Sequence, residues 1–430
     1  MLRLRRLIAT IAMDVGPLRR HRDFRLLFTG QIVTFLGSMV TYVALPYQAY
    51  QLSGSALIVG LLGIAEFAPL IAAALLGGAL ADAHDRRRML QLTELGFAAA
   101  SGVLVINALL PDPQLWVLFV VASVMATIDG LQRPSLEALT PRLVERDELP
   151  AASALSSFRM NVGMVVGPAL GGVLIAVIGL PLTYVLDVGT FLFSLAMLRM
   201  MRAVPPPADA ARPSLRGIVE GIRYAAGRPE LVGTYAVDIV AMFFGMPMAL
   251  FPAIAESYGG AGVLGLLYAA PSVGSLVATL SSGWAGRVHR HGRAVCLAAA
   301  GWGAAIVVFG LAPNLAVALF ALGLAGAADM ISGIFRSTIW NQTIPDALRG
   351  RLAGIEQLSY STGPLLGNVE SGVAASLVGI RSAVVSGGVL CVGAVAICAL
   401  AIPAFWRYDS DEFQASTADT REAGATVPRI

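Results

Sequence analysis

The chain has 430 residues, of which 57% are hydrophobic and only 13% charged, and its mean hydropathy is +0.74. This apolar share exceeds what the core of a soluble domain can bury, so the composition excludes an ordinary soluble protein and makes lipid the solvent. The net charge of +3 does not indicate a nucleic-acid partner, and the distribution of the charges carries more information than their sum.

Apolar runs of about 20 residues, the length at which a helix crosses a hydrocarbon core, recur along the sequence from residue 25 to residue 405. The runs are continuously apolar and rich in Leu, Ala and Gly, which favours helices over the alternating strands of a membrane barrel. We therefore predict an all-α integral membrane protein with twelve transmembrane helices. The predicted spans are 25–48, 56–81, 91–110, 115–139, 152–178, 181–201, 231–255, 261–286, 293–311, 314–340, 351–377 and 380–405.

The arginines gather on alternate connections between these spans. They fill the segment before residue 25 and the connections around 86–88, 142–146, 199–228, 287–293 and 349–351, whereas the opposite connections hold only Arg381. The positive-inside rule then places both termini in the cytosol. The N-terminal segment lacks a signal-peptide cleavage site, so we expect it to stay attached as a cytosolic segment of a multi-pass protein of the inner (plasma) membrane.

A proline-rich polar stretch divides the twelve spans into two groups of six. Gly163, Gly167 and Gly172 recur as glycines displaced by 200 residues, which indicates that the second group repeats the first. We predict two pseudo-symmetric six-helix bundles, an arrangement typical of transporters that rock about a central site. The predicted parts are a cytosolic segment 1–24, a bundle 25–201, a linker 202–230, a bundle 231–405 and a disordered tail 406–430.

The loop after the second span, GGALADAHDRRRML (residues 77–90), concentrates charge in a chain that has little. It resembles motif A of the major facilitator superfamily: Gly78, Asp82, Arg86 and Arg87 occupy the motif's positions, while Asp85 replaces its usual glycine. The resemblance implies a cytosolic gate latch, for which Glu137 is a candidate partner of Asp82 and Arg86. The alternative is that the arginines only anchor the helix end on the cytosolic side.

The fifth span contains GMVVGPALGG, which resembles motif C, the glycine-rich signature of exporters in that superfamily. The resemblance implies export and a helix that can bend; the alternative is tight helix packing alone. Other segments, including LTPRLVERDELPAASAL and QTIPDALRGRLAGI, resemble the superfamily's siderophore exporters. The residues that match motif C are Gly163, Gly167, Pro168, Gly171 and Gly172.

Charged side chains inside the spans are costly in lipid and are therefore candidates for function. The arginines are Arg133, Arg159 and Arg336, and the carboxylates are Glu66, Asp129, Asp238 and Asp329. A guanidinium binds oxyanions and stacks on aromatic rings, as a catechol-type ligand requires. Proton coupling needs a buried carboxylate that titrates, and Asp129, one helical turn from Arg133, is the first candidate. The alternative is that these charges pair with one another and only bridge helices.

The resulting hypothesis is a secondary active exporter, coupled to protons, of a siderophore-like (enterobactin-type) small molecule. Multidrug efflux by a member of the same superfamily is the alternative. An enzyme is not indicated, because the sequence shows no nucleophile with a base, metal cluster or phosphate loop. Expected partners are the small-molecule cargo, protons and the bilayer, with no nucleic acid, no metal, no cofactor and a monomeric state. His289 and His291 are expected in a solvated loop.

Overall fold

The computed structural model describes residues 14–83, 85–204 and 222–410; within these ranges the side chains of 75–83, 346–351, 353–355, 357 and 358 are left out. Every regular element in this part of the chain is a helix. The first group is α2 (Gly16–Arg20), α3 (Arg22–Ser53), α4 (Ala56–Ala83), α5 (Arg86–Leu109), α6 (Leu115–Leu139), η1 (Thr140–Arg142), η2 (Arg146–Glu148) and α7 (Leu149–Met200). The second is α9 (Pro229–Gly245), η3 (Met248–Leu250), α10 (Phe251–Tyr258), α11 (Ala261–Leu280), η4 (Ser282–Arg287), α12 (His291–Gly310), α13 (Leu315–Thr343), α14 (Asp346–Val378), α15 (Ile380–Ala401) and α16 (Pro403–Trp406).

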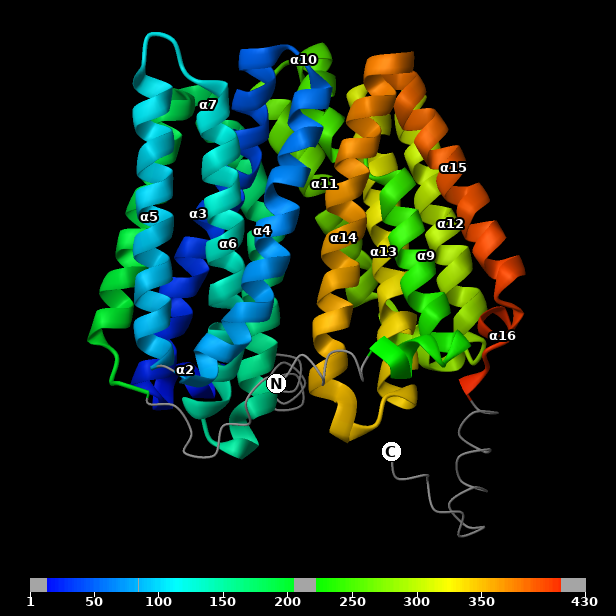
Figure 1. Cartoon of the computed structure of the whole chain (residues 1–430), viewed down its shortest axis with the longest axis horizontal. Helices are drawn as coiled ribbons and strands as arrows, with labels where there is room; N and C mark the ends of the chain where they lie inside the picture. The colour runs from blue at the N-terminus through cyan, green and yellow to red at the C-terminus, as the bar shows by residue number, and fades with distance from the viewer. Residues whose placement is uncertain (1–13, 84, 205–221, 411–430) are drawn as a thin grey trace, which may run out of the picture. The chain divides into compact units, whose positions relative to one another are not determined.

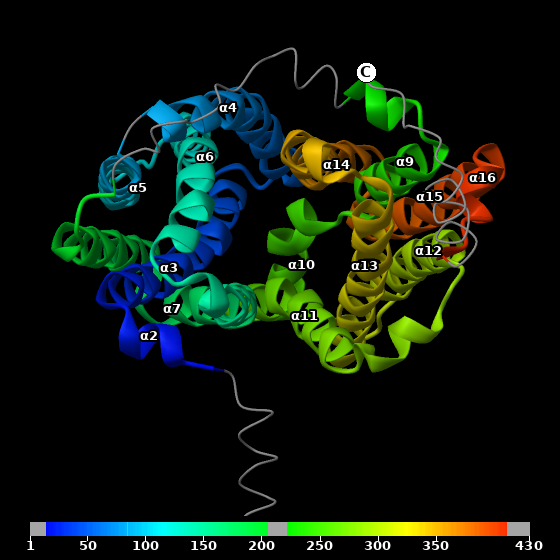
Figure 2. The same cartoon turned by 90° about the horizontal axis from the view of Figure 1, so that it is seen from below.

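The described residues form two compact units. Among the described residues, unit 1 draws on 14–54, 64–83, 85–204 and 255–269, and unit 2 on 55–63, 222–254 and 270–410. In unit 1, α3 packs along α7, and α5 packs against both α6 and α7 (Figure 1). In unit 2, α12 lies between α13 and α15, and α9 contacts α12, α14 and α15 (Figure 2). Each unit is therefore a helical bundle with its own core.

Ten helical segments of the described chain are long and apolar enough to cross a membrane. One of them, Arg146–Met200, contains two helices, because Gly179 has φ 77° and breaks α7. A further helix, α14, has 33 residues but includes the undescribed side chains near its start. The all-α membrane fold is thus confirmed, and the described residues supply at least ten of the twelve predicted spans.

The backbone supports the internal repeat seen in the sequence. The helices α6 and α13 begin at Leu115 and Leu315, and the two breaks with positive φ fall at Gly179 (77°) and Gly379 (84°). Both pairs are displaced by 200 residues. A left-handed φ favours glycine, so these two positions specify equivalent tight connections in the two halves.

The glycines of the fifth predicted span, in α7, lie where helices approach closely. A Cβ on Gly167 would overlap Met39 of α3, and a Cβ on Gly172 would lie 2.7 Å from the backbone nitrogen of Gly265 in α11. The repeat glycine Gly367 faces Met246 in the same manner. Small residues therefore set these helix crossings, which is the packing interpretation of the motif.

The first residues of the predicted disordered tail are packed against unit 2. Phe405 is fully buried, and a Cβ on Gly233 or Gly292 would overlap it. Tyr408 donates its hydroxyl proton to Gln342 of α13 at 3.1 Å, and the backbone N–H of Ser410 donates to the carbonyl of His289 at 3.0 Å. Residues 406–410 thus belong to the folded bundle, a correction that arises because the aromatic side chains at 405 and 408 find glycine-lined contacts; the predicted tail beyond Ser410 lies outside the described residues.

Polar contacts hold the short helix α2 to the rest of unit 1. Arg20 donates to Glu148 Oε1 at 2.8 Å, and His21 Nε2 contacts Glu148 Oε2. Burial opposes ionisation of Glu148, but the hydrogen bonds from His21 and Arg20 outweigh it and lower the pKa of this carboxyl. The contact therefore joins the chain entering α3 to the turn that precedes α7.

Candidate functional site

The best-defined charged cluster in unit 2 joins α9 to α13. Arg336 of α13 pairs through NH1 with Asp238 of α9, and both side chains are only 4% exposed. The other terminal nitrogen, NH2, lies 3.5 Å from Asp329, whose side chain is 41% exposed. Ser359 of α14 donates to the second oxygen of Asp238 at 3.0 Å. Three of the predicted site residues therefore come together in one buried ion-pair cluster.

Aromatic side chains surround this cluster. The Arg336 guanidinium lies 5.6 Å from the ring centroid of Tyr360, within cation–π range. Trp340 contacts Tyr360 edge-on at 5.6 Å and stacks on Tyr235 at 5.7 Å. Trp340 is fixed by its indole N–H, which donates to Thr234 at 2.9 Å. The cluster thus combines a cation with flat rings held in defined positions.

Two hydrogen-bond donors of the cluster have no acceptor among the described residues. They are Nε of Arg336 and the hydroxyl of Tyr235, both shielded from solvent. Buried polar groups are almost always hydrogen-bonded, so unused donors in such a place need an explanation. Together with the neighbouring rings, they suit a ligand that carries oxygen acceptors on an aromatic scaffold.

In unit 1 the predicted pair is more exposed. Arg133 and Asp129 of α6 pair at 3.2 Å, with side chains 47% and 41% exposed. Glu66 of α4 is near enough to Asp129 for their charges to interact. Rings from two helices lie in the same unit, where Tyr42 of α3 meets Tyr268 of α11 edge-on at 5.4 Å. This arrangement leaves Arg133 accessible, unlike Arg336.

Sequence reasoning missed a buried carboxylate in α5. Glu94 is 0% exposed and accepts hydrogen bonds from Gln31 at 2.9 Å, Thr34 at 3.2 Å and Gln132 at 3.3 Å. The signal was available, because Glu94 is an isolated acidic residue within the predicted span 91–110. Its partners are neutral, so a search of the sequence for pairs of opposite charges does not identify it.

Arg159 of α7 belongs to the same region. Its NH1 donates to Gln31 Oε1 at 3.2 Å, and its guanidinium lies 5.9 Å from the centroid of Phe35. Its Nε is shielded from solvent and has no acceptor in the described part of the chain. The structure therefore links Arg159 to Gln31 rather than to a carboxylate.

The predicted latch is described only in part: Gly78 lies in α4, and the side chain of Asp82 lies outside the described residues. Arg86 is buried and donates to the carbonyl of Ala138 at 3.0 Å, beside Glu137, whose side chain is exposed. Arg87 donates to the carbonyl of Met201 at 2.5 Å. Asp85, which replaces the motif's glycine, accepts from the backbone N–H of Arg87 and caps α5.

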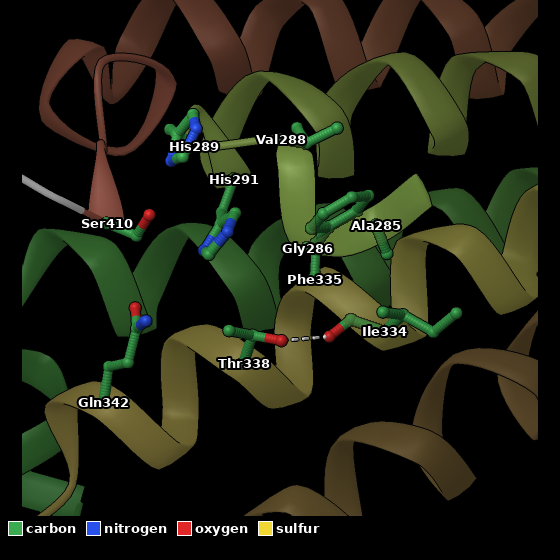
Figure 3. Close-up of a pocket in the computed structure, with 10 residues that line it drawn as sticks. All are labelled: Ala285, Gly286, Val288, His289, His291, Ile334, Phe335, Thr338, Gln342 and Ser410. Atoms are coloured by element: carbon green, nitrogen blue, oxygen red, sulfur yellow. Dashed lines mark hydrogen bonds between the residues drawn. The ribbon is translucent and has the colours of Figure 1, made fainter. Parts of the chain in front are cut away.

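A pocket of about 310 Å³ in unit 2 is lined by residues of α13 that lie on both sides of Arg336 in the sequence, but not by Arg336 itself. Figure 3 shows His289 and His291 beside Gln342 and Ser410 on its wall. His291 is buried and contacts the ring of Phe335, so it is a packed residue and not part of a solvated loop. No group of three metal-ligating side chains occurs among the described residues.

The fold matches solved membrane transporters. A structure of a POT peptide transporter in complex with alafosfalin aligns with a TM-score of 0.71 at 14% identity, covering 94% of this chain and 99% of that one. A bacterial homologue of the iron transporter ferroportin aligns with a TM-score of 0.67 at 15% identity, covering 90% and 98%. At these identities the likeness shows the fold alone: the chain shares the multi-helix fold of these two proteins.

Sequence comparison narrows the class. The model of the family described as transmembrane secretion effector (MFS_3) matches residues 12–422, and the chain belongs to this family of the major facilitator superfamily. An enterobactin exporter of Citrobacter koseri is 30% identical over 389 residues, covering 89% of this chain and 92% of the relative. An enterobactin exporter of Shigella boydii is 28% identical over 396 residues, covering 90% and 94%. The protein is thus a membrane transporter, as the sequence resemblance predicts.

Proposed function

We propose that this protein exports an enterobactin-type siderophore across the bacterial inner membrane, driven by inward movement of protons. The two relatives named above are enterobactin exporters and align over about nine-tenths of their length. The observation that carries the cargo assignment is the Arg336 cluster. Its unused donors, on Arg336 and Tyr235, lie beside the rings of Tyr360 and Trp340.

The chemistry of a catechol fits these groups. A catechol ring offers a flat face for stacking and two adjacent oxygens that accept from a guanidinium N–H or a phenol O–H. The carboxylates Asp238 and Asp329 pair with the guanidinium, so that it is not left as an uncompensated buried charge.

Transport by everted membrane vesicles tests the proposal, because their outer surface is the cytosolic one. Vesicles holding the protein should accumulate iron-free enterobactin when their interior is acidified, and a protonophore should abolish the accumulation. Accumulation that persists with the protonophore would reject proton coupling. Accumulation of ethidium without enterobactin would reject the cargo and establish drug efflux instead.

Two variants sharpen this test. Arg336→Lys keeps the charge but removes the planar fork and the Nε donor, so enterobactin uptake should fall about tenfold at equal protein level. Arg290→Gln is the matched control, because Arg290 is exposed in the connection before α12 and should leave uptake unchanged. Equal rates for both variants would exclude Arg336 from cargo binding.

We further propose that both termini face the cytosol, that Asp82, Arg86, Arg87 and Glu137 form the gate latch, and that the protein works as a monomer. The confinement of arginine to alternate connections supports the cytosolic placement of both termini. A reporter that works only in the cytosol should be active when it is fused after Ile430. If a reporter that works only outside the cytosol is active there instead, the proposed topology is wrong. Light scattering of the purified protein should give one chain per particle, with two chains rejecting the monomer.

A further inference from the structure

Glu94 is a buried carboxylate, and no cation adjacent to it occurs among the residues that the structure describes. It accepts from an amide and a hydroxyl of α3, Gln31 and Thr34, and from an amide of α6, Gln132. Ser194 of α7 also faces it. All four partners are neutral. By contrast, Asp238 pairs with Arg336, and Asp129 pairs with Arg133. A carboxylate in such surroundings can gain and lose a proton without breaking an ion pair.

Gln31 connects this carboxylate to a cation. Its Nε2 donates to Glu94 Oε1 at 2.9 Å, and its Oε1 accepts from Arg159 NH1 at 3.2 Å. An ionised carboxylate only accepts hydrogen bonds and a guanidinium only donates them, so the amide can satisfy both in one orientation alone. The ionised state of Glu94 therefore fixes the position of the Arg159 guanidinium.

We propose that Glu94 and Gln31 form a relay that orients Arg159 for the cargo, and that protonation of Glu94 switches this contact off. A protonated carboxyl has an O–H to donate, and the side-chain carbonyl of Gln31 is one of the acceptors that the residues around Glu94 offer. When the amide turns to accept it, the NH₂ group faces Arg159, which can accept nothing. Arg159 then loses its hydrogen bond to Gln31, and that bond no longer fixes the direction of its unused Nε.

In the relay, proton binding opposes cargo binding, which is the direction of coupling that antiport requires. Cargo binds while Glu94 is ionised, and one proton that binds to Glu94 weakens the cargo contact; loss of that proton restores it. Proton and cargo thus exclude each other although they touch different residues. The charged group joined to the relay is Arg159 from α7, and the groups that face Glu94 from α3, α6 and α7 are uncharged. This inference rests on the proposed proton-coupled export.

The chain offers a matched control in Asp187 of α7. This carboxylate lies in the same unit, is 1% exposed and accepts from the hydroxyls of Thr41 at 2.6 Å and Ser101 at 2.7 Å. None of the hydrogen bonds described for it leads to an arginine. Replacing Asp187 by Asn therefore perturbs a buried carboxylate without touching the relay.

Binding of enterobactin to the purified full chain, measured between pH 5.5 and 8.5, tests the relay. In the wild type, affinity should fall by about tenfold or more as Glu94 becomes protonated, the size expected for one hydrogen bond to a charged group. Glu94→Gln should bind weakly at every pH, and Gln31→Ala should likewise lose the pH dependence. Asp187→Asn should keep it. A pH dependence that survives in Glu94→Gln or Gln31→Ala overturns the relay but leaves the exporter assignment intact.

Infrared difference spectra between the same pH values give a readout that needs no cargo. The wild type should show the C=O band of a protonated carboxyl together with a shift of a glutamine amide band. Glu94→Gln should lose the carboxyl band, whereas Gln31→Ala should keep it and lose the amide shift. A carboxyl band without any amide shift in the wild type overturns the relay, and a failure of enterobactin binding with both bands present faults the cargo alone.

Discussion

The buried pair of Asp238 and Arg336 allows a quantitative test of how unit 2 is stabilised. The change is Asp238→Asn, which preserves volume and removes the charge. Both side chains of the pair are 4% exposed, and the carboxylate that Arg336 then keeps is Asp329, at 3.5 Å and 41% exposed. Removing one partner of a buried pair costs about 3–5 kcal/mol, and an exposed partner offsets at most about 1 kcal/mol. The expected loss of unfolding free energy is therefore about 2–4 kcal/mol.

Two further variants isolate the charge effect. Asp329→Asn removes only the exposed partner and should cost at most about 1 kcal/mol. Adding Arg336→Met to Asp238→Asn removes the stranded charge and should recover part of the loss, because an apolar replacement for a buried pair is often nearly neutral.

Unfolding of the purified protein in mixed detergent micelles, followed by tryptophan fluorescence, measures all four proteins. The reasoning is refuted if Asp238→Asn and Asp329→Asn cost the same. It is also refuted if adding Arg336→Met to Asp238→Asn recovers no stability, since the stranded charge would then not account for the loss.

Three other expectations concern different regions. Gly167→Val should destabilise unit 1 by about 2–3 kcal/mol because the helix crossing leaves no room for a side chain, whereas Gly189→Ala, with open space around it, should be neutral in the same unfolding assay. The lowered pKa of Glu148 means that its contact with His21 stabilises the fold above the carboxyl's ordinary range and is lost on acidification through the lowered value; hydrogen exchange of α2 should rise there and in Glu148→Gln at neutral pH. Arg133→Ala should leave stability within about 0.5 kcal/mol, because the side chain is half exposed, but should reduce enterobactin uptake more than ethidium uptake in everted vesicles.

The fold was predictable because its determinants are local. Long apolar runs specify membrane helices whatever their partners, and glycine spacing reveals the repeat, which the backbone shows again at Gly179 and Gly379. The packed residues after the last span were not predictable, because Tyr408 and Ser410 are held by Gln342 and His289, which are distant in sequence. Burial of that kind depends on tertiary contact and leaves no periodic pattern.

The site was predictable in its charges and not in its neutral connections. Charged residues within lipid stand out, so Asp238, Asp329 and Arg336 were identified before their contacts were known. The role of Gln31 depends on two hydrogen bonds to residues on other helices, α5 and α7, and a glutamine in a long helix carries no signal of its own. Likewise, the different exposure of Arg133 and Arg336 follows from packing rather than from position in the sequence.

The make-up of the two units has a consequence for synthesis in the cell. Unit 1 includes Ala255–Ala269, and unit 2 includes Ser55–Gly63, so neither is assembled from one continuous half of the chain. When synthesis has passed the linker, Ala255–Ala269 of unit 1 has not yet been made. Ser55–Gly63 is made early, but its partners in unit 2 follow only after the linker. Two fragments divided at the linker should therefore mature only when they are produced together, each completing the other.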